Sequence, residues 1–171
     1  MNKSEFRQKI FNFSDHIYPM AHRILGDRQS AEDAIQEIMM KLWLKRKSVQ
    51  HHPNLKGLIV MTARNHCIDM LRKRMKVVHV RQEDIQDDTR EVHVNNYEWQ
   101  HLFSTINTIL QKVPEQQREV FLMRDIDGYD YNEIAFALNI KPAHCRVLLS
   151  RVRKYIAKEL ETTYQYERGM Y

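Results

Sequence analysis

The chain has 171 residues, enough for one ordinary domain or two small ones. It contains only 4 glycines and 4 prolines, which is few for a turn-rich β protein. Its formal net charge is +5, a mild basicity that is compatible with a polyanionic partner but common among globular proteins. No apolar run approaches the roughly 20 residues of a membrane-spanning helix, so we expect no insertion into a membrane.

The first residues and the cysteines indicate the compartment. The segment that starts at Met1 lacks the apolar stretch of a secretory signal. Cys67 and Cys145 lie far apart and form no CxxC pair, which argues against a disulfide framework or a redox motif. We therefore expect a cytoplasmic protein.

The N-terminal part, up to about residue 76, has a helical pattern. Ile35, Ile38, Met39 and Leu42 recur at i, i+3, i+4 and i+7, which predicts one amphipathic helix over residues 30–44. Ser30 is its predicted N-cap, with Asp33 at the capping-box position. His51 to Asn54 breaks the chain before a second helix over residues 55–75, because the residue before a proline disfavours helix.

Residues 77–96 differ in character. They are rich in carboxylates and show no sustained apolar period; the acidic residues are Glu83, Asp84, Asp87, Asp88 and Glu91. We interpret this segment as an acidic linker between two domains, because long unstructured loops are uncommon inside compact folds. A long surface loop within one domain is the alternative.

Helical periodicity returns over residues 97–171. Pro114 suits the first turn of a helix, Asp127-Gly128 breaks the chain, and Asp130 opens a short helix to Leu138. Asn139 can take the left-handed conformation that ends it, and a longer helix runs from Pro142 to about residue 160. Two helices separated by three or four residues have helix-turn-helix proportions. The sequence thus predicts an all-α protein of two small helical domains, residues 1–76 and 97–171, joined by the linker.

The last helix carries the clearest functional pattern. Its predicted inward residues are Cys145, Leu149, Val152 and Ile156. Its opposite face carries Ala143, Val147, Ser150, Arg151, Lys154 and Lys158, flanked by His144 and Arg146. Residues 141–158 include six Lys or Arg residues and no carboxylate, whereas solvated surface helices usually interleave Glu with Lys. This pattern favours a recognition helix for the DNA major groove over a plain surface helix.

Two further faces stand out in the N-terminal part. A second basic cluster, from Arg64 to Lys76, places Asn65, Asp69, Arg72 and Lys76 on one stripe. It suits either a second nucleic-acid contact or the C-terminal end of a helix, where the macrodipole favours cations. The helix over 30–44 carries an acidic and amide face of Glu32, Asp33, Gln36 and Glu37. That face is either solvated or bound by a basic protein.

Catalytic patterns are absent from the sequence. It contains no Gly-rich phosphate loop, no GxSxG and no HExxH, so we predict no enzyme and no cofactor. His51, His52, His66 and Cys67 are the best candidate metal ligands, but their spacing matches no ordinary zinc pattern, so no metal site is predicted.

Taken together, these segments resemble an extracytoplasmic-function (group four) sigma factor over nearly the whole chain. Residues 24–37 with Lys41-Leu42-Trp43 resemble the family's polymerase-docking helix. Ala63-Arg64-Asn65 with residues 68–72 resembles the helix that meets the melted minus-ten element. Residues 114–121, 127–129 and 131–135 resemble the domain that binds the minus-thirty-five element.

The resemblance implies a role for each matching position. It implies core RNA polymerase, promoter DNA and an anti-sigma factor as partners, and an acidic linker that threads the polymerase interior. The polymerase-binding residues would be Asp33, Gln36 and Glu37. The minus-ten side would use Asn54 and Lys56, near a flipped base, with Asn65, Asp69 and Arg72 on the melted strand. The minus-thirty-five side would use His144, Arg146, Val147 and Arg151.

The chain also departs from the family pattern. Leu58 stands where the family usually has Trp, which bears on a melting role for an aromatic side chain. Val147 and Leu148 stand where small polar and basic residues are usual, and Val147 could contact a thymine methyl group. The main alternative function is a stand-alone helix-turn-helix regulator, which leaves the acidic helix and the second basic helix unexplained. A metal-dependent helical enzyme is more distant still.

Overall fold

The computed structural model describes residues 1–80 and 97–168, and every regular element in these ranges is helical. The described residues form two compact units. The first contains the chain up to Val80 together with Asn132–Asn139, and the second contains residues 97–131 and those from Ile140 onward. No helix in the described ranges is both long enough and apolar enough to span a membrane.

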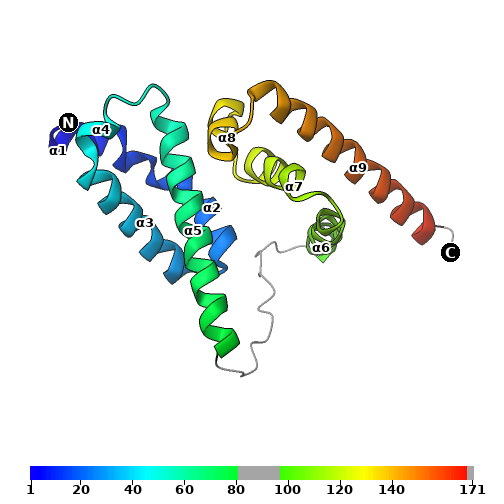
Figure 1. The fold of residues 1–171 in the computed structure, drawn as a ribbon. Coiled ribbons are helices and arrows are strands. Elements are labelled where there is room, and N and C mark those ends of the chain that lie inside the picture. The colour runs from blue at the N-terminus through cyan, green and yellow to red at the C-terminus, as the bar shows by residue number, and fades with distance from the viewer. Residues whose placement is uncertain (81–96, 169–171) are drawn as a thin grey trace. The chain divides into compact units, whose positions relative to one another are not determined.

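The first unit is built on three long helices. These are α2 (Ser14–Leu25), α3 (Arg28–Leu44) and α5 (Leu55–Val80), and each packs against the other two (Figure 1). Shorter elements, α1 (Lys3–Lys9), η1 (Phe11–Phe13) and α4 (Arg46–Val49), precede α2 or follow α3. The core between the long helices contains the fully buried side chains Ile17, Met20, Ile38, Ile59 and Val60.

The connection between α2 and α3 is set by two consecutive residues. Gly26 ends α2 in the left-handed conformation, with φ of +87°. Asp27 is then extended and caps α3, its Oδ1 accepting a hydrogen bond from Ser30 N at 2.7 Å. The predicted N-cap at Ser30 is therefore wrong. Asp27 stands three residues ahead with an ionised acceptor, and this backbone hydrogen bond lowers the pKa of the Asp27 carboxyl group.

Asn54 begins α5 in a similar way. Its Oδ1 accepts a hydrogen bond from Gly57 N at 2.9 Å, and its carbonyl accepts one from Leu58 N at 3.0 Å. The helix continues to Val80, past the predicted end of the domain at residue 76. The rest of the predicted linker, residues 81–96, lies outside the described residues.

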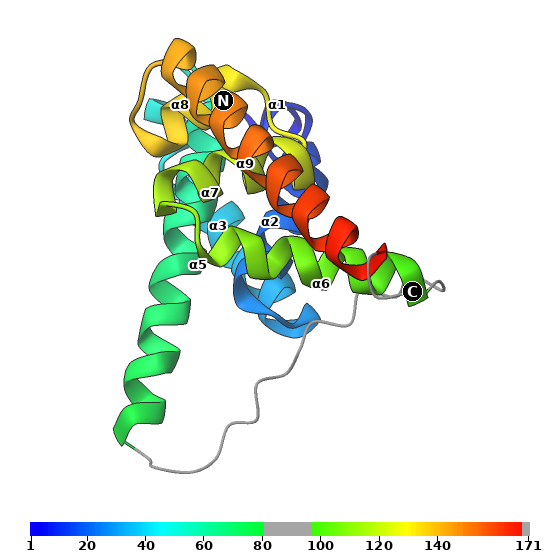
Figure 2. The same cartoon turned by 90° about the vertical axis from the view of Figure 1, so that its right-hand side faces the viewer.

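The second unit contains α6 (Tyr97–Gln111), α7 (Glu115–Phe121) and α9 (Pro142–Arg168). Both α6 and α7 pack against α9, and Figure 2 shows α6 running beside α9. A five-residue π-helical segment, η2 (Leu122–Ile126), continues α7 and ends where Asp127 N donates to Leu122 O. The core residues of this unit include Ile109, Val120, Met123, Leu149 and Val152.

The predicted pair of helices with a short turn is present. α8 spans Tyr131–Leu138, and Asn139 follows it with φ of +53°, as predicted. α9 then begins at Pro142, also as predicted, where proline costs no intrahelical hydrogen bond. The break before α8 contains Gly128, whose φ is +81°.

The connection at Gly26 generates a stability prediction. Gly26→Ala places a Cβ atom in the left-handed region, so we expect a loss of about 1–2 kcal/mol in the free energy of unfolding. A new Cβ would meet no atom within 4 Å, so the loss measures backbone conformation alone. Gln29→Ala, at an exposed position of α3, is the control and should be neutral. Equal urea midpoints for Gly26→Ala and wild type would refute this account.

Candidate protein and nucleic-acid interfaces

The first candidate interface is an acidic surface on α3, formed by Glu32, Asp33, Gln36 and Glu37. All four side chains are exposed. They are exposed because the opposite side of α3 is buried in the three-helix core; the buried residues are Ala31, Ala34, Ile38, Met39 and Leu42. The predicted polymerase-binding residues Asp33, Gln36 and Glu37 thus lie together on one accessible face.

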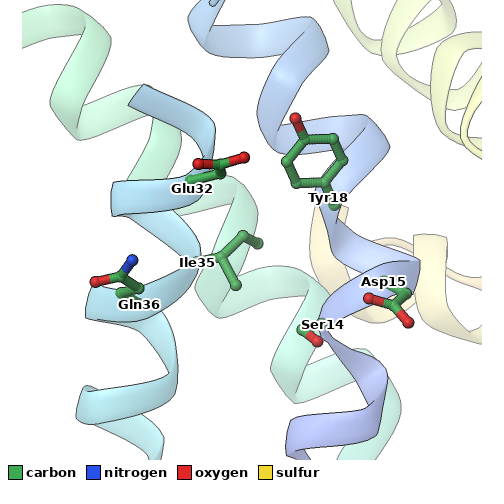
Figure 3. Close-up of a pocket in the computed structure, with 6 residues that line it drawn as sticks. All are labelled: Ser14, Asp15, Tyr18, Glu32, Ile35 and Gln36. Carbon is green, nitrogen blue, oxygen red and sulfur yellow. The ribbon is translucent and has the colours of Figure 1, made fainter. Parts of the chain in front are cut away.

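A shallow pocket of about 250 Å³ borders this acidic surface (Figure 3). α2 contributes Ser14, Asp15 and Tyr18, and α3 contributes Glu32, Ile35 and Gln36. The lining thus combines two carboxylates with an aromatic ring and one apolar side chain. No lining residue is cationic, although Arg28 Nε donates to Glu32 Oε1 at 2.7 Å from outside the lining. A positively charged side chain with an apolar stem suits such a lining.

Behind the acidic surface, the ring of His66 lies between α3 and α5, and its side chain is 10% exposed. Lys41 Nζ lies 2.6 Å from His66 Nδ1, and Glu37 Oε2 lies 3.2 Å from His66 Nε2. Burial lowers the pKa of His66, and the positive charge of Lys41 lowers it further, whereas Glu37 opposes both effects. The sequence offered His66 only as a candidate metal ligand.

The second candidate interface is a polar face of α5. Asn65, Asp69 and Arg72 are exposed, as predicted for residues that share one stripe, and Asp69 lies 3.9 Å from Arg72. Lys56 is also exposed near the start of α5. Asn54 differs from the other four, because the Oδ1 atom of its side chain caps the helix. Its Nδ2 atom donates to Asn132 O at 3.4 Å, so this side chain would have to exchange a hydrogen bond in order to contact a base.

The third candidate interface is a basic face of α9. His144, Arg146, Val147 and Arg151 are all exposed. The predicted inward residues are all buried; these are Cys145, Leu149, Val152 and Ile156. Leu148 is buried with them, at 4% exposure, so it belongs to the core. Of the two apolar departures noted in this helix, only Val147 stands on the exposed face, where it is 45% exposed.

Two interactions beside this face were not predictable from helical spacing. The guanidinium carbons of Arg146 and Arg124 lie 4.7 Å and 4.8 Å from the centre of the Tyr131 ring. Arg124 also donates to Tyr129 O at 2.6 Å. The Tyr131 ring therefore holds Arg146 by a cation–π contact. A single sequence contains no signal for such a pairing, because Tyr131 begins α8 whereas Arg146 lies in α9, beyond the turn between the two helices.

Arg153 is withdrawn from the basic face by an ion pair. Its Nε and Nη2 atoms donate to the Asp125 carboxylate of η2 at 2.9 Å and 2.6 Å. Both carboxylate oxygens are used, so the pair is bidentate. Arg153 therefore joins α9 to η2, although by composition it counted among the basic residues of a recognition helix.

The metal hypothesis gains no geometric support. Among residues 1–76 and 101–163, whose side chains the structure describes, no three His, Cys, Asp or Glu side chains are grouped as metal ligands would be. Cys67 is fully buried, and burial raises the pKa of its thiol to about 11. Such a thiol is a poor metal ligand at neutral pH, because the thiolate is the ligating form.

Comparison with known proteins matches two segments of the chain to one family. Residues 12–77 match the family model described as "Sigma-70 region 2", and residues 104–162 match "Sigma-70, region 4". SigE, an extracytoplasmic-function (ECF) RNA polymerase sigma factor of Mycolicibacterium smegmatis, is 27% identical over 89% of this chain. SigW of Bacillus subtilis, also an ECF sigma factor, is 24% identical over 93% of this chain. The alignments cover 62% of SigE and 90% of SigW.

Solved structures share the fold. The sigma factor RpoE of Bartonella quintana, in complex with the anti-sigma factor NepR, gives a TM-score of 0.62 at 20% identity. The match covers 92% of this chain and 97% of RpoE. CnrH, in complex with the cytosolic domain of CnrY, gives 0.60 at 16% identity, with coverage of 94% and 90%.

The chain therefore belongs to the extracytoplasmic-function sigma factors of the sigma-70 family.

Two of the arginines of α9, Arg151 and Arg153, generate the next prediction. Arg153→Ala breaks the bidentate pair with Asp125, so we expect it to lower the free energy of unfolding by about 1 kcal/mol. Arg151→Ala removes an equal charge from an exposed position two residues away and should leave stability unchanged. Thermal unfolding of the two variants in parallel measures the difference. Similar midpoints would show that the Asp125 pair contributes nothing.

Proposed function

We propose that this protein binds core RNA polymerase and directs it to specific promoters, acting in the cytoplasm and without catalysis of its own. The observation that carries the proposal is the segregation of charge between faces. The exposed side of α3 is acidic, whereas the exposed side of α9 is basic and has no carboxylate between Lys141 and Lys158. Surfaces of opposite sign suit two different partners, a basic protein and a nucleic acid.

Docking to polymerase is assigned to the acidic surface. Asp33, Gln36 and Glu37 would meet basic clamp helices of the largest polymerase subunit, as the family resemblance implies. The pocket beside Glu32 and Tyr18 would take one basic side chain of the same partner. Its apolar floor at Ile35 can accommodate the methylene stem of lysine or arginine.

Promoter contacts are assigned to the faces of α5 and α9. Asn65, Asp69 and Arg72 would face the melted minus-ten strand, with Asn54 and Lys56 near a flipped base. On α9, His144, Arg146, Val147 and Arg151 would face the minus-thirty-five element. The Tyr131 ring limits the freedom of Arg146, which reduces the entropy lost when that side chain binds DNA.

Regulation by an anti-sigma protein is part of the proposal. Two similar solved proteins, RpoE and CnrH, are held in complexes, and the partner of RpoE is named as an anti-sigma factor. We infer that this chain has a corresponding partner, which would compete with polymerase for one or more of these faces.

Charge reversal tests the docking assignment. Asp33→Lys with Glu37→Lys places like charges against a basic partner, so we expect binding to core polymerase to fall by at least about tenfold while the helical signal is unchanged. Glu115→Lys with Glu161→Lys, two exposed positions in the second unit, makes the same change in net charge and should bind normally. Equal affinity of both double variants for core polymerase would contradict the assignment.

Arg151→Ala tests the assignment of α9. If Arg151 contacts guanine in a bidentate manner, promoter binding by the reconstituted holoenzyme should weaken by about 1–3 kcal/mol with relaxed preference at one upstream position. A phosphate contact would instead weaken binding to all sequences and reduce the salt slope by about one. Core polymerase affinity should not change, and Lys112→Ala, at an exposed position outside α9, is the control. Unchanged promoter selection and unchanged salt dependence would exclude this face.

The same assays separate the alternative function. A stand-alone helix-turn-helix regulator shifts promoter DNA in a gel without core polymerase, whereas a sigma factor requires polymerase for specific binding. Transcription in vitro with core polymerase, followed by sequencing of the selected promoters, then defines the recognised elements.

A further inference from the structure

The contact between His66 and the acidic surface has a consequence for docking, given that α3 binds polymerase as proposed above. Glu37 and Lys41 are one turn apart on α3, and the ring of His66 contacts both side chains from α5. Glu37 is 56% exposed, whereas His66 is 10% exposed. One side of the Glu37 carboxylate therefore faces a buried ring, and the other side is open to a partner.

The position of the proton on His66 follows from its neighbours. A lysine ammonium group has only donors, so Lys41 Nζ donates to Nδ1 at 2.6 Å. A neutral imidazole that accepts at Nδ1 carries its proton at Nε2. That nitrogen lies 3.2 Å from Glu37 Oε2, but the contact is out of line with the N–H bond and leaves buried Nε2 without a well-formed hydrogen bond.

A buried donor without a good acceptor is costly, and the nearby carboxylate can satisfy it by a small rotation. This rotation of the Glu37 carboxylate also selects one of the several orientations that an exposed glutamate side chain can adopt. We propose that His66 is a positioning residue for polymerase docking, whose Nε2–H holds the Glu37 carboxylate in the orientation that receives a basic side chain of the partner. Lys41 contributes by keeping the proton of His66 on the nitrogen that faces Glu37.

The charge state of His66 then affects docking. A protonated ring would repel Lys41 and would pair with Glu37, which would neutralise the carboxylate that the partner requires. A basic partner next to Glu37 further disfavours the protonated ring, so docking lowers the pKa of His66. Affinity should therefore fall as the pH decreases through the pKa of His66. The other charged groups near the ring are Asp69 and Lys73 of α5, while Arg23 of α2 lies near the adjacent Cys67.

Substitutions at His66 test the proposal through binding of the full-length protein to core polymerase. His66→Leu removes both polar contacts, so we expect affinity at pH 7.5 to fall about three- to tenfold. His66→Gln retains an acceptor for Lys41 and a donor for Glu37 but cannot titrate. Its affinity at pH 7.5 should stay within about twofold of wild type. When the pH is lowered to about 5.5, the affinity of wild type should fall more than that of His66→Gln, because only the histidine can be protonated.

A double-mutant cycle separates positioning from a merely structural role. Glu37→Gln should weaken docking by itself, and His66→Leu should cause little further loss in that background, because its effect passes through the Glu37 carboxylate. Equal losses in both backgrounds would overturn the proposal, as would wild-type affinity of His66→Leu. In either case normal docking by the wild-type protein would leave the proposed function intact. Failure of wild type to bind core polymerase would instead reject the proposed function itself.

Discussion

The burial of one apolar stripe on each helix is the constraint on which the other features depend. Full burial of a Leu, Ile or Met side chain contributes roughly 1.5–3 kcal/mol, whereas an exposed ion pair contributes about 1 kcal/mol or less. Packing therefore sets the rotation of each helix, and the charged residues occupy the positions that remain. On α3 the burial of Ile38 and Leu42 turns Asp33 and Glu37 outward. On α9 the burial of Leu149 and Val152 does the same for Arg151.

The different roles proposed for α3 and α9 follow from this constraint. Each exposed helix face acquires the composition of its polar positions, acidic on α3 and basic on α9, without any need for long-range organisation. The two region models match the two halves of the chain separately, and the charge of the exposed faces of α3 and α9 suits the partner proposed for each face. A sigma factor needs two such faces, because it must bind a protein and a nucleic acid at the same time.

Interactions between helices then modify the faces that periodicity defines. Arg153 is a basic residue of α9, yet its guanidinium group is bound to Asp125 of η2. Leu148 stands in the part of α9 that faces DNA in the resemblance, yet it is buried. On α3, Glu37 is exposed as expected, but its carboxylate contacts His66, a largely buried histidine of α5. The partners of Arg153 and Glu37 lie more than 20 residues away in the chain, so local pattern could not predict these contacts.

What the sequence by itself determined were the properties that have a local cause. The helical class, the breaks at Gly128 and Asn139 and the inward stripe of α9 followed from spacing and turn residues, and the family followed from the resemblance of three ordered motifs. The choice between neighbouring residues that could cap the same helix was less predictable: Asp27, and not Ser30, caps α3. Only the tertiary structure decided which polar residues stay available on a face. It bound Arg153 to Asp125, placed Arg146 against Tyr131 and brought His66 to Glu37. These pairings depend on how separate helices pack, which no one-dimensional period encodes.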